Sequence, residues 1–137
     1  MLPDPVSHVN RLRLPIGIQT FSDIRELSYY YVDKTPQIER LVTENDYCFL
    51  SRPRRFGKSL LLDTIRCLFE GRQELFEGLA IESRWDWTTS HPVIRISFSD
   101  GVLHSRPALD DRIRDQLHVQ REHLDVTLDR QTDIAGE

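Results

Sequence analysis

Cysteine is scarce in this sequence of 137 residues, and long apolar runs are absent from it. The two cysteines, Cys48 and Cys67, suggest neither a disulfide framework nor a zinc site, and we expect both to be buried, inert thiols. No apolar run approaches the length of a membrane span, and the N-terminus has no signal-peptide pattern. The sequence therefore predicts a cytoplasmic protein with no membrane partner.

An excess of positive charge is also lacking, because the formal net charge is -4. No global basic field is present to hold nucleic acid, so any anion site must be local. The five histidines show no metal-ligand spacing, and His118 and His123 do not share one helix face, so we assign them no metal. No set of serine or cysteine with histidine suggests covalent catalysis. The 39% hydrophobic and 29% charged fractions are those of an ordinary globular domain.

The most informative stretch runs from Ser51 to Ser59, with the sequence SRPRRFGKS. Gly57-Lys58-Ser59 matches the end of a P-loop, in which backbone N–H groups at a helix N-terminus cradle phosphates. The lysine reaches the outer phosphates, and the serine hydroxyl ligates Mg²⁺. Arg52 stands where the usual pattern has its first glycine, so the interpretation depends on the flanking segments.

Those flanking segments have the expected order of strand, loop and helix. Residues 47–50 form a short apolar run typical of a buried strand, and apolar residues recur at helical spacing from Leu60 to Phe69. Gly71 is a plausible stop for that helix. This order puts Lys58 and Ser59 in the first helical turn, where the helix dipole favours an anion. The four cations of the loop favour an anion-binding role over a solvated basic loop; they are Arg52, Arg54, Arg55 and Lys58.

Further elements are expected on both sides of the loop. The patterns predict a short helix over 21–27, an extended segment over 29–32, a helix that Thr35 caps, a strand over 92–98 and a final helix that Ser105 caps. Trp85 and Trp87 are expected to pack over the core edge rather than to stack on bases. We divide the chain into a loose extension (1–13), one domain (14–128) and a frayed tail (129–137).

The sequence resembles the predicted AAA-ATPase-like family of bacterial proteins. The resemblance is carried by LPIGI at 14–18, YVDKT at 31–35, FLSRPRRFGKSL at 49–60 and WDW at 85–87 ahead of PVI at 92–94. It implies a P-loop NTPase core with ATP and Mg²⁺ as the bound group, Lys58 on the phosphates and Ser59 as a Mg²⁺ ligand. The implied binding set is Arg52, Arg54, Arg55, Phe56, Gly57, Lys58, Ser59 and Leu60. Members of this family are usually longer and often carry a nuclease-like domain of the PD-(D/E)XK type.

The sequence lacks the acidic strand that a P-loop hydrolase uses to hold Mg²⁺ and position water. The predicted strand over 92–98 corresponds to an earlier, non-catalytic strand of the family, and Asp100 after it is interpreted as a loop acid. We therefore expect the N-terminal part of an ATPase, with hydrolysis only if another chain supplies the missing elements. The fold class that follows is α/β, a three-layer P-loop core whose parallel sheet is incomplete at this length.

Three alternatives stay open at this point. Asp33 is interpreted as a helix-entry acid or the partner of a nearby Lys or Arg in an ion pair, rather than as a nucleotide contact. Gln19 is a candidate for a hydrogen bond to the base. The chain as a whole could instead be a non-catalytic interaction module whose arginine loop binds a phosphate-rich partner such as nucleic acid, although the acidic balance argues against it. It could also be a truncated product that folds poorly alone or forms homo-oligomers, because unpaired strands expose apolar faces.

Overall fold

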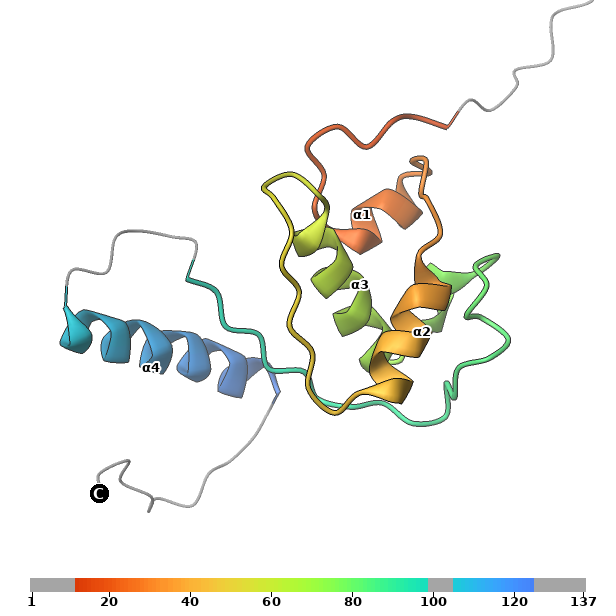
Figure 1. Ribbon diagram of the computed structural model, residues 1–137. Helices are drawn as coiled ribbons and strands as arrows, with labels where there is room; N and C mark the ends of the chain where they lie inside the picture. The colour runs from red at the N-terminus through yellow and green to blue at the C-terminus, as the bar shows by residue number, and fades with distance from the viewer. Residues whose placement is uncertain (1–11, 99–104, 125–137) are drawn as a thin grey trace, which may run out of the picture. The chain divides into compact units, whose positions relative to one another are not determined.

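The computed structural model describes residues 12–98 and 105–124. The chain divides into two compact units, residues 1–91 and residues 92–137, and each is described by itself. The first unit contains α1 (Phe21–Glu26), α2 (Thr35–Glu44), α3 (Lys58–Phe69) and the 3-10 helix η1 (Gln73–Phe76), and the second contains α4 (Arg106–His123) (Figure 1). Within the described ranges, no helix combines the length and the apolar character that a bilayer crossing requires.

The core of the first unit consists of buried residues from α1, α2, α3 and η1 and from the turn that follows η1. Its buried members are Phe21, Ile38, Cys67, Leu68, Leu75, Phe76 and Ile81. The Phe21 ring lies 4.9 Å from the ring of Phe76 between centroids, and the Trp87 ring lies 5.2 Å from that of Phe76. Trp85 packs edge-on against Phe69. The tryptophan pair therefore belongs to the core edge, as predicted, since both rings pack against buried residues.

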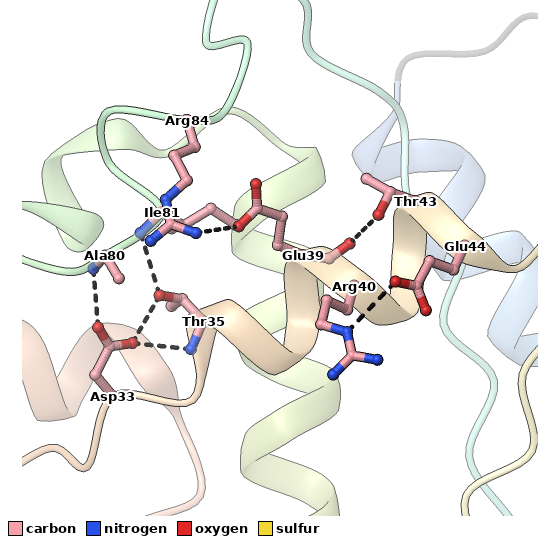
Figure 2. A network of polar contacts seen from close by, with 9 residues as sticks. All are labelled: Asp33, Thr35, Glu39, Arg40, Thr43, Glu44, Ala80, Ile81 and Arg84. Carbon is pink, nitrogen blue, oxygen red and sulfur yellow. Dashed lines mark hydrogen bonds and ion pairs between the residues drawn. The ribbon is translucent and has the colours of Figure 1, made fainter.

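A carboxylate organises the start of α2. Asp33 Oδ1 accepts hydrogen bonds from the Thr35 backbone N–H at 2.8 Å and from the Thr35 hydroxyl at 2.6 Å. Its Oδ2 accepts from the Ala80 N–H at 2.8 Å, and the buried Thr35 hydroxyl accepts in turn from the Ile81 N–H at 3.3 Å. Figure 2 shows this network joining the beginning of α2 to the turn at residues 80–81. The interpretation of Asp33 as a helix-entry acid is confirmed, whereas the predicted cap, Thr35, is itself the first helical residue.

Two of the predicted helices around the loop are found close to their expected bounds. α1 covers the predicted short helix, and α3 ends at Phe69, followed by Gly71 in a left-handed conformation with φ of 73°. The Gly71 N–H donates to the Leu68 carbonyl, so the glycine helps to satisfy the end of the helix. Helical periodicity was a sufficient signal here because each helix buries one apolar stripe.

The predicted parallel sheet is wrong. No sheet is found among the described residues, which are mostly helical, and Arg13 and Tyr29 form an isolated parallel bridge. Residues 47–51 are neither helix nor strand, and Tyr47 and Phe49 are 95% and 94% exposed. Cys48 is exposed as well, so only Cys67 is the buried thiol that was predicted. An apolar run becomes a strand only when neighbouring strands supply its hydrogen bonds and cover its faces, and local sequence does not guarantee such neighbours.

In the second unit, side chains of α4 make hydrogen bonds to the backbone of residues 92–98, the other predicted strand. The Gln116 side-chain amide donates to the Ser97 carbonyl at 2.8 Å and accepts from the Ser97 N–H at 2.7 Å. Gln120, one turn further along α4, makes the same two bonds with the backbone of Arg95. These side chains take the role that a neighbouring strand would have. At the start of α4, Ser105 Oγ accepts from the Ala108 N–H at 3.3 Å, which confirms the predicted cap.

Candidate functional site

The loop before α3 has a sharply bent backbone. Gly57, the residue before the helix, has φ of 74°, and Arg55 has φ of 67°, in the left-handed region that residues with a side chain rarely adopt. The Gly57 carbonyl accepts the first intrahelical bond, from the Leu61 N–H at 2.9 Å. The N–H groups of the first turn therefore have no acceptor within the helix, and they lie at the positive end of the helix dipole.

Lys58 folds back across its own loop. Its ammonium donates to the carbonyl of Arg52 at 2.5 Å and to the carbonyl of Pro53 at 2.8 Å. An ammonium has three donors, so these contacts use two of them. The loop thus arches around the lysine side chain, which is half-buried while the residues from Arg52 to Gly57 are exposed.

A cavity of about 820 Å³ opens beside this loop. One wall comes from the loop and the first turn of α3, and the other comes from residues 15–19, which precede α1. The loop side contributes Arg54, Arg55, Gly57, Lys58, Ser59 and Leu60. Three of the lining residues are cations and none is a carboxylate, so the lining favours an anion.

Six of the eight predicted binding residues therefore line one cavity, and two do not. Arg52 and Phe56 are exposed outside the lining, although Arg52 contributes its carbonyl to Lys58. Among the residues that the structure describes, no ion pair engages Arg52, Arg54 or Arg55. The Mg²⁺ role predicted for Ser59 is not tested, but the side chain is exposed and lines the cavity.

Sequence reasoning missed most of the second wall. It proposed Gln19, which does line the cavity, but not the four residues before it. The signal that the sequence did offer is the LPIGI motif at 14–18, which contains these four residues and carries the family resemblance, although it does not indicate which segment they face. In the structure, Gly17 has φ of 76°. Ile16 is 87% exposed, so the core does not account for it. Asp100, the acid that sequence analysis interpreted as a loop residue, lies outside the described residues.

A second, smaller cavity of about 280 Å³ adjoins the first, and it shares with it Pro15, Gly57 and Leu60. Its lining is mainly apolar and aromatic, with Tyr30 and Tyr31 among the contributors. Burial raises the pKa of the Tyr31 phenol above its ordinary value, with a smaller opposing effect from its hydrogen bond to Thr64. The phenol is therefore neutral at physiological pH, and the mainly apolar lining, to which Lys34 adds one cation, suits an apolar group.

Comparison with known proteins places the chain in a family. The family described as Predicted AAA-ATPase matches residues 15–136, and the chain belongs to it. A curated relative, an uncharacterized protein in the vnfD 5' region of Azotobacter chroococcum mcd 1, is 50% identical over 119 residues. That match covers 86% of this chain and 23% of the relative, so the chain spans about a quarter of the relative's length. No solved structure matches the chain.

Proposed function

We propose that this chain binds a nucleoside triphosphate, ATP with Mg²⁺, at the loop that precedes α3. The observation that carries the proposal is the lining of the larger cavity, in which Arg54, Arg55 and Lys58 meet the N-terminus of a helix without any carboxylate. A polyphosphate is the ligand that such an arrangement favours, because backbone N–H groups and cations act on it together. Membership of the Predicted AAA-ATPase family supports the same ligand.

Each residue of the first turn has a distinct role in this proposal. The N–H groups of Lys58 and Ser59 would donate to phosphate oxygens, and Gly57 allows the chain to enter the helix from a left-handed conformation. The Lys58 ammonium would turn from the carbonyls of its own loop toward the outer phosphates, while Arg54 and Arg55 add charge at the cavity wall. Bound Mg²⁺ would neutralise phosphate charge, with the Ser59 hydroxyl as its protein ligand.

The nucleoside would lie against the wall formed by residues 15–19. Gln19 carries both a donor and an acceptor, so its amide can pair with the edge of a base. The apolar cavity that shares Pro15 and Gly57 with the phosphate side is a suitable neighbour for a flat ring. The loop wall of the larger cavity would thus hold the phosphates. The wall formed by residues 15–19, with the apolar cavity beside it, would hold the base.

The proposal is confined to binding. Hydrolysis also needs an acid that holds Mg²⁺ and a group that positions water, and we assign neither role to a residue of this chain. The activity of full-length family members is a separate question, because this chain corresponds to about a quarter of its curated relative.

Calorimetric titration with ATP tests the proposal. We expect saturable binding that strengthens when Mg²⁺ is present and weakens by about 10- to 100-fold in Lys58→Ala, since a hydrogen bond to a charged group is worth about 1.5–3 kcal/mol. Arg84→Ala is the matched control, because it removes one exposed cation whose described partner is Glu39 and leaves the loop intact. Equal ATP affinity in wild type and Lys58→Ala would refute the proposed role of the loop.

A phosphate-rich macromolecule is the second candidate ligand. The observation in its favour is that Arg52, Arg54 and Arg55 are exposed on one loop without an ion pair among the described residues. Binding of this kind would weaken steeply with salt and would not require Mg²⁺, whereas ATP binding should depend on both. Titrations with a single-stranded oligonucleotide and with ATP, each at two salt concentrations and with and without Mg²⁺, separate the two candidates: salt-sensitive oligonucleotide binding without Mg²⁺ favours the macromolecule, and Mg²⁺-dependent ATP binding favours the nucleotide.

A further inference from the structure

A buried carboxylate on α3 caps the helix that follows the second wall of the cavity. Asp63 is 3% exposed, and its Oδ2 accepts a hydrogen bond from the Phe21 N–H at 2.7 Å. Phe21 is the first residue of α1, and the residue before it, Thr20, makes no side-chain cap bond. The N–H of a first helical residue has no acceptor within its own helix. In this unit, that acceptor comes from a different helix, 42 positions along the chain.

The charge of Asp63 is compensated on the same helix. The Arg66 guanidinium lies 2.9 Å from Asp63 Oδ1, and its Nε donates to the same oxygen at 3.1 Å. One carboxylate oxygen therefore pairs with a cation while the other accepts from α1. A buried carboxylate without such partners would be costly, so the geometry that it adopts here is well defined.

This hydrogen bond joins the two helices that adjoin the walls of the proposed nucleotide site, since α3 begins at the loop and α1 begins two residues after Gln19. Asp63 follows Lys58 by five residues, which corresponds to a rise of about 7.5 Å along α3. Gln19 precedes Phe21 by two residues, and α1 and α3 lie in contact in the same unit (Figure 1). The Asp63–Phe21 bond thus fixes the start of α1, and with it residues 15–19, against the helix that carries the phosphate loop.

We propose that Asp63 is a positioning residue for nucleoside recognition: its hydrogen bond to Phe21 holds the segment that ends at Gln19 beside the phosphate loop, where both line one cavity. The inference rests on the proposed function, because it concerns the same ligand. Asp63 touches neither the base nor the phosphates, and it acts through the segment that it anchors.

Paired titrations with ATP and inorganic tripolyphosphate separate the two walls. Tripolyphosphate reports on the loop alone, whereas ATP reports on both walls. We expect wild type to bind ATP more tightly than tripolyphosphate, and Asp63→Ala to weaken ATP binding by about tenfold with tripolyphosphate affinity unchanged. Asp63→Asn keeps an oxygen acceptor for the Phe21 N–H, so it should retain most of the ATP affinity.

A double-mutant cycle shows whether Asp63 acts through Gln19. Gln19→Ala should weaken ATP binding by a factor similar to that of Asp63→Ala, and Asp63→Ala should have no further effect in the Gln19→Ala background. Ile38→Val is the control for lowered stability, because it removes one buried methyl group and no hydrogen bond. We expect it to change neither affinity.

The outcomes distinguish the two proposals. If wild type binds neither ligand, the proposed function fails, and this inference fails with it. If wild type binds both ligands equally, or if Asp63→Ala weakens both by the same factor or neither, only the inference on Asp63 is overturned. Independent, multiplicative losses in the double mutant overturn it as well. Should Asp63→Ala fail to fold, Gln19→Ala still decides the matter because Gln19 is exposed, and an ATP affinity equal to wild type would refute the inference.

Discussion

Replacing Asp33 with alanine should destabilise the first unit, and it should do so more than the same change at Asp86, another acidic loop residue. The carboxylate accepts from the Thr35 N–H, the Thr35 hydroxyl and the Ala80 N–H, and it thereby joins the start of α2 to a turn 47 residues away (Figure 2). Alanine leaves these donors without their acceptor. Thr35 is fully buried, so water cannot easily replace the carboxylate there.

The magnitude follows from these contacts. The bond to the Thr35 N–H resembles a helix cap, which is worth about 1 kcal/mol. The bond to the Ala80 N–H is a hydrogen bond to a charged group, worth about 1.5 kcal/mol or more. The expected loss in free energy of unfolding is therefore about 2–3 kcal/mol, which would lower the urea midpoint by about 1–2 M.

The effect should depend on pH with a defined sign. Burial alone raises the pKa of Asp33, but hydrogen bonds from the Thr35 hydroxyl and from the Ala80 and Thr35 N–H groups outweigh it, so the pKa lies below its ordinary value of 3.8. A lowered pKa in the folded state means that the stabilisation is fully present above the pKa of the unfolded chain. The difference in stability between wild type and Asp33→Ala should stay constant from about pH 5 to 7 and shrink as the pH falls below 3.8.

Asp86 offers a matched control within the same chain. Asp86 and Thr88 repeat the pattern of Asp33 and Thr35, since Asp86 Oδ1 accepts from the Thr88 N–H at 3.0 Å and from the Thr88 hydroxyl. Its bonds remain within its own turn. Urea unfolding of Asp86→Ala should therefore show a smaller loss than Asp33→Ala. Equal losses in the two variants, or a loss for Asp33→Ala that persists unchanged at pH 3, would refute the reasoning.

Two further predictions use paired or local changes. Gly57→Ala and Gly78→Ala should each lower the free energy of unfolding by about 1–2 kcal/mol, because both glycines have positive φ and space for a Cβ. Only Gly57→Ala should also weaken ATP binding. Equal ATP affinity in the two variants would contradict the proposed role of the loop. Ser105→Ala removes the acceptor of the Ala108 N–H, so hydrogen exchange at that amide should quicken about fivefold, in line with a cap of about 1 kcal/mol. Unchanged exchange would show that the cap contributes nothing to α4.

The helices were predictable because their signals are local. The apolar spacing from Leu60 to Phe69 and the Thr35-Pro36 start each describe a segment that buries one stripe. α3 contains the predicted span, and α2 starts one residue earlier than predicted, at Thr35 itself. The strands were not predictable in the same way. Residues 47–50 carry an apolar strand pattern, but a strand also requires a partner backbone, and in the described residues that partner is absent.

The candidate site likewise has one part that local sequence predicts and one part that depends on tertiary packing. The loop before α3 is contiguous, so the identity of Gly57, Lys58 and Ser59 was sufficient to predict a helix N-terminus with a lysine beside it. The wall opposite the loop comes from residues 15–19, about 40 positions earlier, and its position depends on α1. No local pattern in that segment indicates which part of the chain it will face.

The sequence by itself determined the family and the helices, because each depends on residues that are neighbours along the chain. The tertiary structure alone decided which backbone groups meet side chains far away. Asp33 reaches Ala80, Asp63 reaches Phe21, and the Gln116 amide bonds the backbone of Ser97 in place of a neighbouring strand. The physical reason is that a buried N–H must find an acceptor, and the packing of the core determines which acceptor is within reach.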